Sequence, residues 1–130
     1  MISFKTGELS QGEIEAILNT IPGDITFVGK DDMIRYFNEP AKRLFTRNSS
    51  IMGTSVQQCH PDKSVASVNQ VLEDLKTGRK DIAEFRVGME GKLINIHYLA
   101  VRDGDGEYLG CLEFAQQDVS HVKTQGVPET

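Results

Sequence analysis

A thiol stands next to an imidazole in Cys59-His60-Pro61, directly before a segment with helical spacing. A cysteine at a helix start can become a low-pKa thiolate, and an imidazole can bind a metal ion or haem. The other histidines, His97 and His121, are not at ligand spacing from His60, and sequence neighbours need not have side chains that meet. We therefore expect no metal site, and expect Cys59 and His60 to cap the helix or line a pocket mouth. A redox-, metal- or haem-dependent sensor or enzyme is the alternative.

No other set of residues has the spacing of a catalytic site. The run Asp103-Gly104-Asp105-Gly106 begins like a calcium loop, but Tyr108 stands where that loop needs glycine, so we expect a hairpin turn. The carboxylates, such as Glu84 and Glu113, are scattered, and no nucleophile is paired with a base. The sequence therefore predicts a protein that is not an enzyme.

The composition is that of one modest acidic domain. The 130 residues hold 14 Lys plus Arg against 19 Asp plus Glu, a net charge of −5, which argues against a nucleic-acid partner. No apolar run approaches the roughly 18 residues of a membrane span, and the first residues do not form a signal peptide. Two distant cysteines do not indicate a disulfide framework. We expect a cytoplasmic domain without a membrane partner.

Two amphipathic helices are predicted. In the N-terminal extension, residues 1–23, Ser10 and Glu13 have capping-box spacing and Pro22-Gly23 ends the helical pattern. The apolar residues of this helix form a stripe that needs a covering surface, and they are Ile14, Ile17, Leu18 and Ile21. A longer helix is expected over residues 62–77, with Gly78 as its left-handed cap.

Strands account for most of the remaining chain. Residues 24–37 predict a first hairpin, after which Asn38 is expected to cap a short helix whose Ala41, Leu44 and Phe45 face inward. Three further strands are expected at about 81–89, 93–102 and 107–117. This order predicts an α+β domain over residues 24–120, in which helices cover one face of a five-stranded antiparallel sheet. Residues 121–130 are expected to be a frayed exit or linker.

The order of elements and several short motifs resemble the PAS sensor domain. Val101–Gly106 and Asp118-Val119-Ser120 are similar to the last hairpin and the exit of PAS domains. A narrower resemblance, to a PAS subfamily of bacterial and archaeal proteins often found beside hemerythrin-like bundles, rests on Phe4–Ser10, Asp24–Val28, Arg35–Phe37 and Val56–Pro61. The resemblance covers residues 10–123 and implies a sensory domain. Such a domain binds a small molecule and signals through its leading helix or the exit near Asp118.

The resemblance also implies where a ligand would bind, between the sheet and the helices. Strand residues of one parity would face the helices, with Tyr98 and Gln116 as polar groups that need partners. The expected ligand-binding residues are Phe45, Val56, Cys59, His60, Val68, Leu72, Phe85, Ile94, Ile96, Tyr98, Leu112, Phe114 and Gln116. A closed core that needs no ligand is the alternative, and the domain would then be a dimerisation module.

The cofactor and the partners are less defined. Haem-binding PAS domains usually carry a histidine in the long helix, and residues 62–77 contain none. A light-sensing flavin motif is absent because His60-Pro61 follows Cys59. In a PAS-like fold the leading helix packs on the outer sheet face or on a second subunit, so the apolar stripe favours a homodimer, with docking inside one chain as the alternative. The output partner and the cofactor remain unknown.

Overall fold

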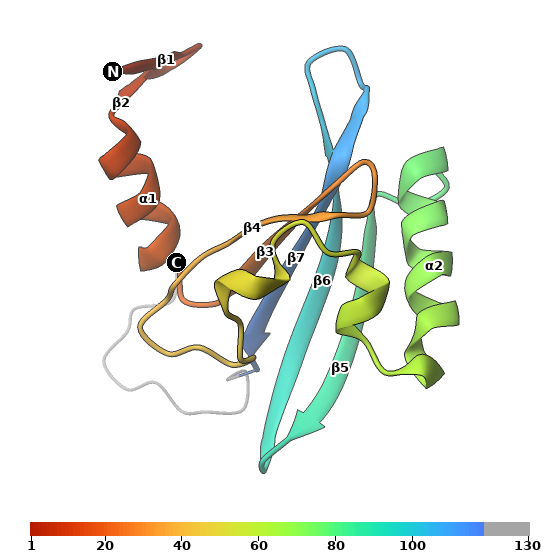
Figure 1. Ribbon diagram of the computed structural model, residues 1–130. Helices are drawn as coiled ribbons and strands as arrows, with labels where there is room; N and C mark the ends of the chain where they lie inside the picture. Colours follow the sequence, from red (N-terminus) through yellow and green to blue (C-terminus); the bar gives the residue numbers. More distant parts are fainter. Residues whose placement is uncertain (119–130) are drawn as a thin grey trace, which may run out of the picture.

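Five antiparallel strands form one sheet in the computed structural model, which describes residues 1–118 (Figure 1). The elements are β1 (Ile2–Phe4), β2 (Gly7–Leu9), α1 (Gln11–Thr20), β3 (Asp24–Gly29), β4 (Ile34–Phe37), the 3₁₀ helices η1 (Ser49–Ile51) and η2 (Val56–Cys59), α2 (Asp62–Thr77), β5 (Ile82–Met89), β6 (Lys92–Arg102) and β7 (Tyr108–Gln117). The strand order in the sheet is β4-β3-β7-β6-β5, so the first strand of the sheet along the chain, β3, pairs with the last, β7. The predicted α+β fold is confirmed.

The helices begin and end where their capping residues require. At α1 the backbone N–H of Glu13 donates to Ser10 Oγ at 3.0 Å, and the N–H of Ser10 donates to Glu13 Oε1 at 2.8 Å, which completes the predicted capping box. At the end of α2, Gly78 has φ +78°, a conformation that favours glycine. The predicted bounds of α2, 62 to 77, are confirmed.

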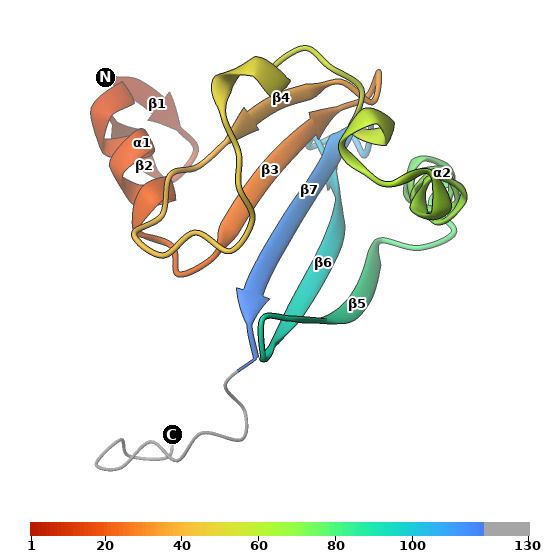
Figure 2. The same ribbon diagram turned by 60° about the horizontal axis from the view of Figure 1, so that its bottom comes forward.

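The main core lies between α2 and the inner face of the sheet. Figure 2 shows η2 and α2 on one side of the strands. Buried apolar side chains from the strands, η2 and α2 form this core, and they are Val28, Ile34, Val56, Val71, Leu72, Leu75 and Cys111. A smaller cluster holds Ile94, Ile96 and Ala115 nearer the other end of the sheet. No helix within residues 1–118 has the length and apolar character needed to cross a membrane.

The segment after β4 differs from the prediction. No helix forms around Ala41, and Asn38 is not a helix cap. Instead the buried carboxylate of Asp24 accepts the backbone N–H groups of Leu44 and Phe45, so tertiary hydrogen bonds replace helical ones. This irregular segment, residues 39–48, is called the strap below. The short hairpin of β1 and β2 was also not predicted.

The expected facing of the last strand is wrong. Tyr98 of β6 pairs with Glu113 of β7, and Ala100 pairs with Cys111, so Cys111, Glu113 and Ala115 share the inner face with the tyrosine. Leu112, Phe114 and Gln116 therefore lie on the opposite face, where Gln116 is exposed. The resemblance to PAS domains had implied the other facing, and the β6–β7 register overturns it although the outward row is the more apolar of the two. Residues 121–130 lie outside the described residues.

Candidate functional site

A cavity of about 460 Å³ opens between the inner face of the sheet, η2, α2 and the strap. Its size lies within the roughly 300–1,000 Å³ of small-molecule sites. Nine of the thirteen residues that the sequence suggested line it, and they are Phe45, Val56, Cys59, His60, Val68, Leu72, Phe85, Ile96 and Tyr98. Phe85 is 43% exposed and lies at the rim, so the cavity communicates with solvent.

The other four suggested residues do not line the cavity. Ile94 is fully buried in the smaller core cluster, where it packs with Ile96 and Ala115. Leu112, Phe114 and Gln116 face away from the cavity because of the β6–β7 register. Sequence reasoning missed nine lining residues, and they are Val28, Arg47, Pro61, Ser64, Ser67, Val71, Val87, Cys111 and Glu113. Helical spacing from Val68 and Leu72 would have found Ser64 and Val71, whereas nothing local to the sequence marks Arg47 or Glu113.

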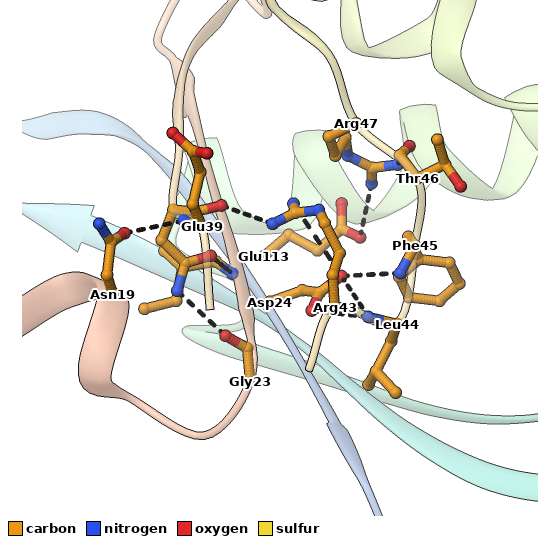
Figure 3. Close-up of polar contacts among 12 residues, drawn as sticks. Asn19, Gly23, Asp24, Glu39, Arg43, Leu44, Phe45, Thr46, Arg47 and Glu113 are labelled. Atoms are coloured by element: carbon orange, nitrogen blue, oxygen red, sulfur yellow. Dashed lines mark hydrogen bonds and ion pairs between the residues drawn. The ribbon is translucent and has the colours of Figure 1, made fainter. Parts of the chain in front are cut away.

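A polar cluster interrupts the apolar wall. Glu113 projects from the middle of β7 and is only 7% exposed. Arg47, on the strap, places its Nη2 3.7 Å from Glu113 Oε1, and Figure 3 shows the two side chains directed at one another. His60 also lines the cavity, and its Nδ1 donates to the carbonyl oxygen of Val56 at 3.0 Å, which fixes the ring. Among residues 1–118, the ionisable groups that line the cavity are these three residues, Tyr98 and the two cysteines.

Burial controls the protonation of these groups. The pKa of Glu113 is raised above its ordinary value by removal from water, while Arg47 and then His60 act in the opposite direction and Asp24 adds to the rise. Burial, and then the charge of Glu113, raise the pKa of the Tyr98 hydroxyl. Burial raises the pKa of Cys111 to about 12, so this thiol is not a nucleophile near neutral pH.

The strap is fastened to β3 beside the cavity. Asp24 is 4% exposed, and its carboxylate accepts the N–H of Leu44 at 3.0 Å and that of Phe45 at 2.8 Å (Figure 3). The guanidinium of Arg43 lies 4.0 Å from Asp24 Oδ2 and donates to the carbonyl oxygen of Asn38. The cavity residue Arg47 therefore belongs to a segment whose position depends on one buried carboxylate.

The strap and Asn38, the residue directly before it, also reach the N-terminal helix. The side chain of Asn38 donates to the carbonyl oxygens of Leu18 and Gly23, at 2.9 Å and 3.0 Å, and accepts from the N–H of Ile25 at 2.8 Å. The N–H of Glu39 donates to the side chain of Asn19 in α1. A continuous set of polar contacts thus joins the cavity wall to the end of α1.

Comparison with known proteins identifies the family. A PAS domain family model matches residues 14–119. The chain belongs to the PAS domain family. None of the curated proteins matches this PAS domain in sequence.

Solved structures agree with the family. A C-terminal domain from Streptococcus mutans is 37% identical, with a TM-score of 0.83 over 89% of this chain and 90% of that one. A PAS domain from Colwellia psychrerythraea is 12% identical, with a TM-score of 0.62 over 84% and 97%. A sensory box sensor histidine kinase from Vibrio cholerae is 12% identical, with a TM-score of 0.59 over 81% and 88%. The last two likenesses concern the fold alone.

The remaining suggested residues of the PAS domain lie away from the cavity. The stripe Ile14, Ile17, Leu18 and Ile21 is not buried, and Ile17 is 49% exposed. His97 lies 3.5 Å from Glu84 on the outer face of the sheet. Within residues 1–118 no group of three or more His, Cys, Asp or Glu side chains is arranged to hold a metal ion. His121 lies outside the described residues.

Proposed function

We propose that this PAS domain is a sensor that binds a small molecule in the cavity between the sheet and α2, and that it acts by binding rather than by catalysis. The observation that carries the proposal is the cavity itself, about 460 Å³ with an apolar wall and one buried carboxylate. Apolar walls with few fixed polar groups are the usual lining of small-molecule sites. PAS domains are typical of sensory and signalling proteins, which is consistent with this role.

The proposed signal leaves through the strap and α1. A ligand that contacts Glu113 changes the surroundings of Arg47, which belongs to the same segment as Leu44 and Phe45. That segment is tied through Arg43 to Asn38, and Asn38 holds the end of α1. The ligand shifts the equilibrium between two positions of the strap, and with it α1, only if it binds one position more tightly than the other. This route favours the leading helix over the exit near Asp118.

The proposed assembly is a homodimer. The stripe of α1 is not buried, although Ile17 and its neighbours are apolar. On the outer face of the sheet an apolar row crosses four strands through direct pairing, from Ile82 to Leu99, Leu112 and Phe27. A second copy offers both an apolar stripe and an apolar row, so a twofold arrangement covers each of them. The narrower resemblance, to PAS domains often found beside hemerythrin-like bundles, and a cytoplasmic location remain predictions of the sequence, and the sequence names no output partner.

The test begins with native mass and absorbance of freshly purified protein. A bound small molecule is expected as extra mass that is lost on unfolding. Ser67→Phe fills the cavity from an exposed lining position and should abolish that mass, whereas Ala66→Phe, at an exposed position beside it that does not line the cavity, should retain it. A Soret or flavin band would favour the haem or redox alternative instead. An unliganded protein that gains no thermal stability from a metabolite library would favour the dimerisation module.

A further inference from the structure

The carboxylate of Glu113 accepts no hydrogen bond from any group within residues 1–118. Its ion-pair partner in the described part of the chain is Arg47, whose Nη2 is 3.7 Å from Oε1, well beyond the roughly 2.7–2.9 Å of a charge-assisted hydrogen bond. In the described part of the chain Arg47 Nε is also buried without a hydrogen-bond partner. The strap and β7 thus hold the two side chains too far apart for a hydrogen bond, and the carboxylate oxygens can still accept one from another group.

Unused acceptor capacity at a buried carboxylate is costly. A carboxylate on a mainly apolar cavity wall gives up part of its hydration, and a ligand that displaces the remaining water must supply a donor in its place. Pairing with Tyr98 and Thr26 fixes the backbone of Glu113 in the sheet and places its side chain on the inner face, toward the cavity. Since Glu113 lines the cavity, a cavity occupant is the group that can reach it.

We propose that Glu113 is the recognition residue of this cavity and that the ligand is an uncharged, mainly apolar small molecule whose N–H or O–H group donates a hydrogen bond to the Glu113 carboxylate. This inference rests on the proposed ligand-binding function and names its ligand class. Phenols, heterocycles with a ring N–H, and primary or secondary amides belong to this class. The body of the ligand lies against the apolar wall formed by residues such as Val68, Leu72 and Ile96.

The charges around the cavity select a neutral ligand. Arg47 already compensates the charge of Glu113, so the pair has little net charge. A cationic ligand at Glu113 would stand close to the guanidinium of Arg47, and an anionic ligand would stand close to the carboxylate. Like charges at such separations repel one another beside a mainly apolar wall. A neutral ligand with an N–H or O–H group donates a hydrogen bond to Glu113 and leaves the net charge of the pair unchanged.

Matched probe pairs test the donor directly by calorimetry. Indole and benzothiophene share shape and apolar area, but only indole has an N–H, and 2-naphthol and 2-methoxynaphthalene differ in the same way. We expect the donor of each pair to bind the wild-type protein about tenfold to a hundredfold more tightly, as for a hydrogen bond to a charged group. Tryptamine and indole-3-carboxylate, which are charged at neutral pH, should bind more weakly than indole.

Two variants test whether Glu113 causes the tighter binding of the donor probe in each pair. Glu113→Leu should reduce the affinity ratio within each probe pair to about one, because the acceptor is gone. Gln116→Leu, at an exposed position on the opposite face, should keep the wild-type ratio. If Glu113→Leu does not fold, Glu113→Gln replaces it, and its neutral amide should lower each ratio below the wild-type value.

The possible outcomes separate the ligand class from the function. Probes that bind with equal affinity within each pair overturn the role of Glu113 and leave the ligand-binding function standing. Tighter binding of a charged probe overturns the neutral class. If no probe binds at all, the proposed ligand class fails, and the native mass and the metabolite library decide the ligand-binding function separately.

Discussion

The side-chain amide of Asn38 donates a hydrogen bond of 2.9 Å to the backbone carbonyl of Leu18, twenty residues earlier in the chain. Leu18 lies in the last turn of α1, whose carbonyl groups have no partner inside the helix. The same carboxamide binds the carbonyl of Gly23 and the N–H of Ile25, so one side chain joins the end of α1 to the start of β3. The N-terminal helix is thus held mainly by hydrogen bonds rather than by apolar burial.

Replacing this carboxamide should destabilise the domain. Asn38 is 1% exposed and makes three hydrogen bonds, so Asn38→Ala should lower the free energy of unfolding by about 2–4 kcal/mol. Chemical denaturation measures this loss. Lys63→Ala, at an exposed position on α2, is the control and should change the free energy by no more than about 0.5 kcal/mol. Equal effects in the two variants would contradict the role of Asn38.

The position of Asn38 in the structure also shows which features sequence patterns can predict and which they cannot. Periodicity and caps predicted the five sheet strands, α1 and α2, because each of these depends on neighbours within a few residues. Asn38 was expected to cap a helix, since an asparagine before a proline-containing segment favours that local role. Its actual partners lie at Leu18, Gly23 and Ile25, and only the folded sheet brings them within reach.

The sequence predicted most of the apolar wall of the cavity but not the buried ion pair within it. Alternation placed Phe85 and Tyr98 on the inner face of their strands, and both line the cavity. On β7 both rows contain apolar residues, so alternation cannot choose between them, and a choice by hydrophobicity selects the wrong one. The buried Glu113 is the residue that breaks the rule, and a polar group on a core face is expected where a binding site departs from ordinary packing.

The proposed homodimer predicts how a substitution in α1 changes the oligomeric state. Ile17 is 49% exposed within one chain, so Ile17→Glu should leave the fold intact while placing a charge in the proposed interface. We expect a folded monomer by analytical ultracentrifugation and circular dichroism. Ala16→Glu changes an exposed neighbour outside the apolar stripe and should preserve the dimer. A dimer of unaltered dissociation constant in Ile17→Glu would exclude this interface, and loss of fold would indicate docking within the chain.

The two thiols should react at very different rates. Cys59 is exposed at the cavity, whereas Cys111 is 1% exposed and burial raises its pKa to about 12. Because only the thiolate attacks an alkylating reagent, Cys111 should stay unmodified at pH 8 until the domain unfolds. Cys59 should be modified in the folded protein, without the acceleration at pH 6 that marks an activated cysteine. Intact mass against time follows both reactions, and rapid modification of Cys59 at pH 6 would favour the redox alternative.

The carboxyl group of Glu113 should make stability depend on pH in a defined direction. Burial raises its pKa in the folded state above the ordinary value of 4.5, even though Arg47 and His60 act against the rise. Below pH 4.5 both the folded and the unfolded chain hold the proton, so ionisation of Glu113 does not affect folding. As the pH rises, the unfolded chain ionises first and gains stability, so the free energy of unfolding falls until the pH passes the raised pKa.

Comparison with Glu113→Gln isolates this effect in the unliganded domain. The glutamine is similar in size and does not titrate, and the contributions of His60 and Asp24 are present in both proteins. We expect the stability of the wild-type protein relative to Glu113→Gln to decrease from pH 4.5 upward, by at most about 1.4 kcal/mol per pH unit. Urea unfolding of both proteins at several pH values between about 4 and 8 measures this difference. A difference that stays constant, or that grows in favour of the wild type, would mean that Arg47 and His60 outweigh the burial of the carboxylate.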